Sequence, residues 1–194
     1  MSQENINRFK SKVSQGFARP NLFEVGMQFP DALNVESDIR KSAQFVVRAA
    51  QIPSFQLGVI EVPFRGRTLK IAGDRTFEPW TVTVMNPNDF KLRNAFEDWV
   101  DYIQSPEANF QTGDGLDYYK DLTVHQLSRD ERKGKQAKRI RSYKFFNCFP
   151  SNVSSVDLDY GNNDAIEEFT VEFQVHRWES LETPKLENLS TDSN

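Results

Sequence analysis

Few residues in this chain have the type and spacing that chemistry requires. The two histidines, His125 and His176, lie in expected strands, and the single cysteine, Cys148, is distant from both in the sequence. No HExxH, CxxC, GxSxG or P-loop spacing occurs. We therefore expect no metal, no cofactor and no catalytic residue, and we expect Cys148, which lies in an aromatic-rich run, to be a buried inert thiol. The sequence predicts a protein that is not an enzyme.

Three weaker patterns have ordinary structural explanations. Residues Thr112–Asp117 resemble a calcium loop, but further acidic positions and a closing Glu are missing, so we interpret them as a glycine-rich turn. Glu167 and Glu168 are adjacent in an expected strand and should point to opposite faces, which disfavours an acid–base pair. The basic run from Arg129 to Arg141 contains Asp130 and Glu131 and no interleaved aromatic residues. A solvated hairpin tip, or a contact with an acidic protein surface, explains it better than phosphate binding.

Composition limits the class of protein. The chain has 194 residues, enough for one domain with extensions, and 16 Phe, 3 Trp and 5 Tyr supply a large core. The net charge of −4 does not indicate nucleic-acid binding by a single copy. One cysteine excludes an internal disulfide and fits a reducing compartment. Neither a signal peptide nor an apolar run of roughly 20 residues occurs, so we expect a soluble protein made in the cytosol.

The stretch Ala72–Asn86 predicts the central element of the fold, a turn followed by a strand, around which the rest of the chain is arranged. Trp80, Val82 and Val84 alternate with threonines and a methionine, which predicts a half-buried strand. Gly73 and the residues up to Pro79 have turn chemistry.

A helix over about 87–103 should follow this strand. Asn86 is a suitable N-cap, Pro87 suits the first helical position, and Asp89 suits the third. An apolar stripe that includes Phe96 and Trp99 should pack on a sheet.

The rest of the chain predicts short strands. These are expected at 23–29, 45–50, 57–64, 68–72, 119–127, 140–149, 156–160 and 169–176. Pro30–Ser42 is expected to be a loop or a short helix, and Pro150–Asn152 a turn. Together these elements predict a mainly β, antiparallel sandwich or barrel with one flanking helix. We expect an N-terminal arm at 1–18, the β domain at 19–179 and a flexible C-terminal extension at 180–194.

Alternation also predicts a core and an opposite polar face. The expected core residues are Trp80, Val82, Val84, Phe96, Trp99, Phe169, Val171, Phe173 and Val175. A sheet with this many strands has open edges, which invite pairing with another chain, and ring formation would remove them.

Three segments together resemble one family. They are FARPNLFEV (17–25), AGDRTFEPWTVTVMN (72–86) and FPSNVSSVDLDYGNNDAIEEFTVEFQVHRWE (149–179). From about Phe17 to Glu179 the chain resembles the tail tube proteins of T4-like contractile-tailed bacteriophages. The resemblance implies a virion protein, made in the host cytoplasm, that forms rings of six copies with a continuous inner β-barrel. The rings would stack into a rigid tube inside a contractile sheath, and double-stranded DNA would pass through it.

The resemblance also implies partners. Besides other copies of the chain, these are the sheath, baseplate and tube-initiating proteins, a tape measure and a tail terminator, with no stable membrane insertion. A lumen through which DNA slides should be polar and not basic, and a ring of six would carry six times −4, or −24. Thr170, Glu172 and Gln174 are the candidate lumen residues.

The candidate contact residues between subunits or rings come from the arm and from the loop at 40–54. They are Ile6, Phe9, Val13, Phe17, Arg48 and Ile52. The segments Pro30–Ser42 and 180–194 depart from the family pattern as additions. Two alternatives remain open: the tube of another contractile machine, such as a secretion system or bacteriocin, and a monomeric β-sandwich binding module.

Overall fold

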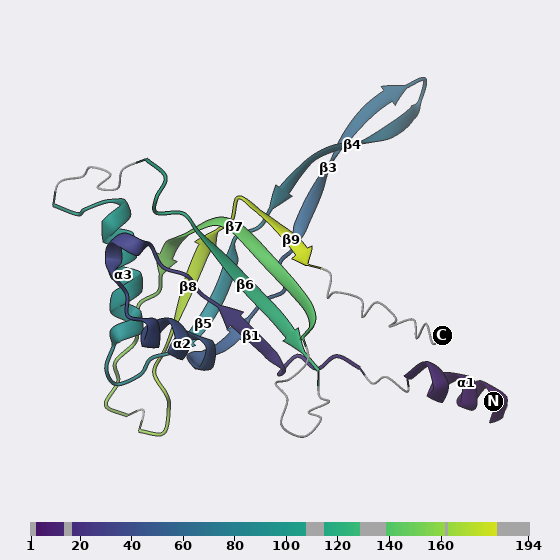
Figure 1. The fold of residues 1–194 in the computed structure, drawn as a ribbon. Helices are drawn as coiled ribbons and strands as arrows, with labels where there is room; N and C mark the ends of the chain where they lie inside the picture. Colours follow the sequence, from purple (N-terminus) through teal and green to yellow (C-terminus); the bar gives the residue numbers. More distant parts are fainter. Residues whose placement is uncertain (1–2, 14–16, 108–114, 129–138, 162, 182–194) are drawn as a thin grey trace, which may run out of the picture.

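The computed structural model describes residues 3–13, 17–107, 115–128, 139–161 and 163–181 (Figure 1). The strands are β1 (Phe23–Gly26), β2 (Val47–Ala50), β3 (Phe55–Phe64), β4 (Arg67–Phe77), β5 (Trp80–Met85), β6 (Lys120–Leu127), β7 (Arg139–Val153), β8 (Glu168–Gln174) and β9 (Arg177–Leu181). The helices are α1 (Gln3–Val13), α2 (Ser37–Val46) and α3 (Lys91–Ile103), with a short 3-10 helix, η1 (Asp31–Leu33). All strand pairs are antiparallel, so the expected mainly β fold is confirmed.

One long strand, β7, takes part in both sheets of the fold. The first part of β7 pairs with β6 on one side and with β9 on the other, and β1 pairs with β6. We call this arrangement sheet I. The last part of β7, from Phe149 to Val153, pairs with β8, and β5 and β2 follow. We call this second arrangement sheet II. Strands β3 and β4 form a hairpin outside both sheets.

The core lies between the two sheets. Trp80, Val82 and Val84 of β5 pair with Phe173, Val171 and Phe169 of β8, and all six are buried. The Trp80 ring stacks on Phe145 of sheet I with 4.3 Å between ring centroids, and its Nε1 donates a hydrogen bond of 2.8 Å to the Gln51 carbonyl. The other expected core residues are also buried, except Val175, which is half-buried.

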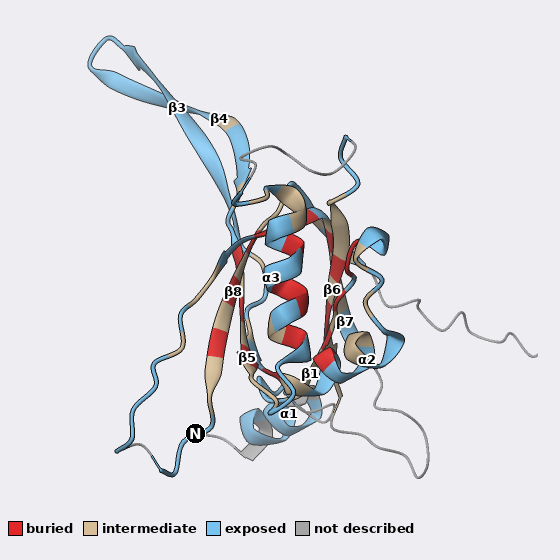
Figure 2. Cartoon of the chain, turned by 90° about the vertical axis from the view of Figure 1, so that its left-hand side faces the viewer, coloured by how far each residue is buried: buried red, intermediate tan, exposed pale blue. Residues whose placement is uncertain are grey.

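Helix α3 covers the opening between the sheets. Its buried face consists of Leu92, Ala95, Phe96 and Trp99. Figure 2 shows α3 between β8 and β6, with buried and exposed positions alternating along the helix. The rings of Phe96 and Phe29 lie 5.3 Å apart, so the segment after β1 completes the packing. The expected helix on a β domain is therefore confirmed.

The start of this helix differs from the prediction. Helix α3 begins at Lys91, and its N-cap is Phe90 in a left-handed conformation with φ of 52°. The reason is that Asn86, the residue after β5, is held by Glu167: its backbone N–H donates to the Glu167 carbonyl, and its side-chain amide donates to the Glu167 carboxylate. Pro87 then accepts the Phe90 N–H in a turn. The Asp89 carboxylate accepts the Lys91 N–H at 3.3 Å, so it caps from outside the helix.

The predicted turn at Gly73–Asp74 is part of a strand. Strand β4 continues through it to Phe77, opposite a register shift between Leu57 and Val59. A Cβ on Gly73 would lie 3.1 Å from the backbone of Gly58, so two glycines allow the strands to approach here. The turn chemistry marks a β-bulge.

The C-terminal predictions also need correction. Residues 150–152 continue β7 instead of turning, because they pair with β8. The strand expected at 156–160 is a loop between β7 and β8 with no ladder partner in the described chain. Strand β9 was not predicted, and it extends to Leu181, beyond the expected domain end at 179.

The N-terminal half differs in smaller ways. Helix α2 extends to Val46, so the second strand begins at Val47 and not at Phe45. Strand β1 ends at Gly26, although Met27 and Phe29 beyond it are buried. Helix α2 occupies part of the segment expected to be a loop or short helix. In the part of the chain that the structure describes, no helix is long and apolar enough to cross a membrane.

Candidate assembly surfaces

The outward face of sheet II is polar. Thr170, Glu172 and Gln174 alternate with the buried residues of β8 and lie half-buried on its other face. Thr83 and Thr81 of β5 stand opposite Thr170 and Glu172. Glu168, on the same face, forms an ion pair with Arg48 of β2. The three candidate lumen residues therefore share one continuous surface of hydroxyl, amide and carboxylate groups.

Sheet II has an open edge on each side in the described chain. Strand β2 pairs with β5 alone. On the other side, Phe149–Val153 of β7 pair with β8, whereas the β6 pairing of β7 stops at Cys148. Both edges present backbone donors and acceptors that a strand of another chain can pair with. A sheet with two such edges can be continued in both directions.

The β3–β4 hairpin extends away from the sandwich and is exposed along almost its whole length (Figures 1 and 2). Directly paired residues share a face, and the side chains alternate along each strand. The register therefore places five large apolar residues on one face: Ile60, Val62, Phe64, Leu69 and Ile71. All five are exposed. The opposite face carries Glu61 and Lys70, which form an ion pair at 3.6 Å.

Trp178 of β9 fixes the base of this hairpin. Its Nε1 donates a hydrogen bond of 3.1 Å to the Ser54 carbonyl, and its ring lies 5.6 Å from Phe55 and 6.3 Å from Phe77. Tyr143 of sheet I packs against the same indole at 5.8 Å. The base of the hairpin is therefore held against sheet I by a residue of β9, a strand that was not predicted from the sequence.

The residues predicted to make contacts between subunits are exposed where the structure describes them. Ile6 and Phe9 lie on α1, Phe17 follows it, and Ile52 lies between β2 and β3. Arg48 is exposed on β2 but engaged with Glu168. Val13 ends α1, and its side chain is outside the described part of the structure. The structure does not bring these residues into one cluster, and their roles remain predictions.

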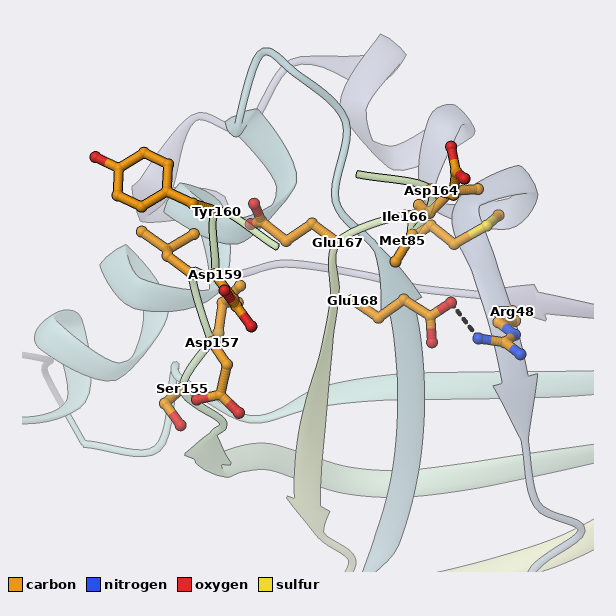
Figure 3. Close-up of a pocket in the computed structure, with 13 residues that line it drawn as sticks. Arg48, Met85, Ser155, Asp157, Asp159, Tyr160, Asp164, Ile166, Glu167 and Glu168 are labelled. Carbon is orange, nitrogen blue, oxygen red and sulfur yellow. Dashed lines mark hydrogen bonds and ion pairs between the residues drawn. The ribbon is translucent and has the colours of Figure 1, made fainter. Parts of the chain in front are cut away.

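An acidic hollow lies between the β7–β8 loop and the end of sheet II (Figure 3). Its volume is about 1080 Å³. Five carboxylates line it, from Asp157, Asp159, Asp164, Glu167 and Glu168. Its apolar lining is Met85, Val156, Leu158, Tyr160 and Ile166. The sequence predicts a strand over part of this loop. The alternation of Asp with Val, Leu and Tyr at 156–160 instead gives the hollow both carboxylates and apolar side chains.

The histidines, the cysteine and the two glutamates that the sequence offered for chemistry do not form one site. His125 is buried, with its Nδ1 2.7 Å from Ser142 Oγ, whereas His176 is exposed. Burial raises the pKa of the Cys148 thiol to about 12, with the Asp121 charge adding to the effect. Glu167 accepts from Asn86, and Glu168 pairs with Arg48. Among the described residues, no group of three His, Cys, Asp or Glu side chains could hold a metal ion.

Parts of two patterns fall outside the described residues. These are the basic run at 129–138 and residues 112–114 of the calcium-like stretch. At the end of the basic run, Arg139 pairs with Glu24 at 3.1 Å, and Arg141 donates to Ser180.

Comparison with known proteins identifies the family. A sequence model described as "Phage tail tube protein" matches residues 18–181. The chain belongs to this family. It is 31% identical over 166 residues to tail tube protein gp19 of Enterobacteria phage T4, covering 86% of this chain and 93% of the relative. It is 26% identical over 171 residues to the tail tube protein of Serratia phage KSP90, covering 87% and 93%. Tail tube proteins are structural components of the phage tail, so the chain is not an enzyme.

Solved structures show the same fold as this tail tube protein. A chain of the anti-feeding prophage baseplate, described as 6-fold symmetrised, has a TM-score of 0.62 at 15% identity, covering 88% of this chain and 99% of that chain. A chain of the sheath–tube complex of an extracellular contractile injection system has a TM-score of 0.55 at 16% identity, covering 94% and 99%. At these identities the likeness concerns the fold alone.

Proposed function

We propose that six copies of this tail tube protein close into a ring in which sheet II of each copy joins those of its neighbours as one inner β-barrel. The proposal rests on the two faces and the two edges of sheet II. One face is buried, the other is polar, and both edges are open within the described chain. Pairing β2 of one copy with Phe149–Val153 of the next would satisfy both edges and leave none exposed. The six-fold symmetry of the structurally similar baseplate supports this number of copies.

The polar face of sheet II would then line the lumen. Thr170, Glu172 and Gln174 present hydroxyl, carboxylate and amide groups, and the nearby Arg48 is engaged with Glu168. Cationic side chains that neutralise phosphates hold DNA and release its counterions. A surface without free cations would instead let double-stranded DNA slide. Stacked rings would thus form the conduit for the genome in a contractile tail.

The other expected partners follow from this place in the tail. A sheath would surround the tube, a baseplate would start it, a tape measure would set its length and a terminator would cap it. The structurally similar chains come from assemblies whose descriptions include a baseplate, a sheath and a tube-terminating cap. Candidate contacts to neighbouring subunits or rings remain the arm residues Ile6, Phe9, Val13 and Phe17, with Arg48 and Ile52.

Electron microscopy of the purified protein at low and high concentration tests the assembly. Rings with six-fold symmetry or hollow tubes are the expected result. Compact monomers at every concentration would contradict the proposal and favour a monomeric binding module.

Single-cysteine labelling tests the lumen. Cys148 is buried with a raised pKa, so it should not react, and a new cysteine reports alone. In Glu172→Cys, a maleimide on a polymer too large to enter the tube should react with dissociated protein but not with long tubes. The matched control, Asp98→Cys on the exposed face of α3, should react in both states. Equal labelling of Glu172→Cys in tubes and in dissociated protein would place this face outside the lumen.

A further inference from the structure

We propose that a matched pair of β-bulges selects the two strands that meet at each joint of the ring and fixes which of their residues face each other. The bulges lie at Arg48 and Ser151, one on each open edge of sheet II. The joint belongs to the proposed ring, so the inference rests on that ring and adds its register. Residues 47–50 of one copy lie opposite residues 153–150 of the next.

The directions of the strands decide how the edges meet. The last part of β7, β8, β5 and β2 are successive neighbours in sheet II, and each pair of neighbours is antiparallel. The end of β7 and β2 therefore run in opposite directions at the two edges of the sheet. When copies of the same orientation stand side by side in a ring, β2 of one copy meets the end of β7 of the next as an antiparallel pair.

Each of these edge strands has one residue more than the strand it pairs with inside the chain. Opposite three consecutive residues of β5, Val82–Val84, strand β2 has four, because Arg48 is an extra residue. Opposite three consecutive residues of β8, Val171–Phe173, strand β7 also has four, because Ser151 is an extra residue. The two four-residue segments therefore match each other one to one, although neither matches its own neighbour.

The buried face of sheet II selects one register. Val47 and Ala50 pair with buried residues of β5, and Val153 and Pro150 pair with buried residues of β8, so all four lie on the core face. With Val47 opposite Val153 and Ala50 opposite Pro150, the core face continues across the joint and the two bulges come together. A slip by one residue would turn core side chains to the polar face. A slip by two residues would separate the bulges.

The side chains of both bulged residues are held within their own copy. Arg48 forms an ion pair with Glu168 of β8. The Ser151 hydroxyl donates a hydrogen bond of 3.2 Å to the Glu172 carbonyl and accepts one of 3.2 Å from the Gln174 side-chain amide. The monomer therefore already has both bulges, and the match exists before two copies meet.

The other open edges lack this feature. In the part of the chain that the structure describes, sheet I ends at β1 and at β9, and both strands pair with their neighbours without a register shift. A bulged strand opposite a regular one leaves its extra residue unpaired. Bulges also discourage an edge strand from pairing with arbitrary chains. The two edges of sheet II are thus disfavoured for other strands and fit each other.

Disulfide mapping across the joint tests the register. Ala49 and Ser151 face each other in the proposed register, and both are exposed in the monomer. A protein with Ala49→Cys and Ser151→Cys, assembled and oxidised, should give a ladder of covalent oligomers on a denaturing gel. Ala49→Cys with Val153→Cys, and Ala49→Cys with Phe149→Cys, report slips of two residues in the two directions. They should give several-fold less product, because Cα atoms more than about 7 Å apart are not bridged without backbone movement.

Background in this experiment is measured with Asp98→Cys and Ser151→Cys, since Asp98 lies on the exposed face of α3. Cys148 is buried and has a raised pKa, so it should not contribute. A stronger crosslink from Ala49 to Val153 or to Phe149 than to Ser151 would overturn the register and leave the ring intact. If no pair crosslinks above background at any concentration, β2 and β7 do not meet, and the ring and the inference are both wrong.

Deletion of the bulged residues tests the match itself. Removal of Arg48 or of Ser151 alone leaves four residues opposite three, and the fraction of protein in rings should fall by about tenfold or more because every joint loses its register. Removal of both leaves three opposite three and should recover rings. Arg48→Ala with Ser151→Ala keeps both extra residues and is the control, which should assemble like the wild type.

Urea denaturation of each deletion variant establishes that its monomer is folded, so that a loss of rings reports the joint. A double deletion with no more rings than either single deletion would overturn the match, and so would a single deletion that assembles like the wild type.

Discussion

Sheet II and the β3–β4 hairpin are both built from alternating large apolar residues, but they differ in what covers them. Trp80 and Phe173 of sheet II are fully buried by sheet I and α3. Ile60 and Leu69 of the hairpin have 54% and 61% of their surface exposed. Alternation therefore predicts that a face will be covered, but not whether the same chain covers it. In sheet II the apolar face stabilises the monomer, whereas in the hairpin it is available to another copy.

The largest expected effect is from Trp80→Ala in the core. The change removes the indole that stacks on Phe145 and donates to Gln51, and it leaves a cavity between the sheets. Loss of a buried Trp should lower the free energy of unfolding by about 3–5 kcal/mol. Urea denaturation followed by circular dichroism measures it. A loss near zero would show that the two sheets do not depend on this contact.

Trp178→Ala should have a smaller effect on stability and a larger one on the hairpin. The change removes ring contacts to Phe55 and Phe77 and the bond to Ser54. Because the indole is only half-buried, we expect a loss of about 1–2 kcal/mol. A two-stranded hairpin is marginal by itself, so limited proteolysis should cut within residues 55–77 sooner than in the wild type. Unchanged cleavage would mean that the hairpin holds its direction without Trp178.

Changes on the apolar face of the hairpin should leave the monomer nearly unaffected. Ile60→Thr with Leu69→Thr keeps residues that favour strands, so the free energy of unfolding should change by no more than about 0.5 kcal/mol per site. Assembly, measured by sedimentation, should nevertheless fall, because the exposed apolar face that is open to another copy becomes polar. Val59→Thr, on the opposite face, is the control. A monomer destabilised as strongly as by Trp80→Ala would show that the two regions are not separate.

Local sequence patterns were sufficient to predict the elements that form the core. The stripe of α3 and the alternation of β5 and β8 predicted the core because each apolar face meets another apolar face inside the chain. Strand β9 escaped prediction because none of its residues, Arg177–Leu181, is fully buried and most are polar, so no alternating apolar face marks it. Only its pairing with Ser142–Phe146 of β7 makes it a strand. The bulge at Gly73 had the composition of a turn, and the start of α3 moved because Asn86 bonds to distant Glu167. Such long-range hydrogen bonds leave no periodic signal.

The smallest expected effect is the contribution of His125 to the pH dependence of stability. His125 is buried in β6 of sheet I and not in the hairpin. Burial lowers its pKa below the ordinary value of 6.5, and the nearby Arg139 adds to this, while Glu24 opposes it. The folded state therefore binds fewer protons than the unfolded chain just below pH 6.5, and stability should fall as the pH is lowered through that range. His125→Gln, which keeps a polar partner for Ser142, should flatten the dependence between pH 7.5 and 5. The hairpin has no histidine, so the same pH change should not alter the rate at which the hairpin of the wild type is cut. An unchanged slope of unfolding free energy against pH in His125→Gln would assign the acid sensitivity to other groups.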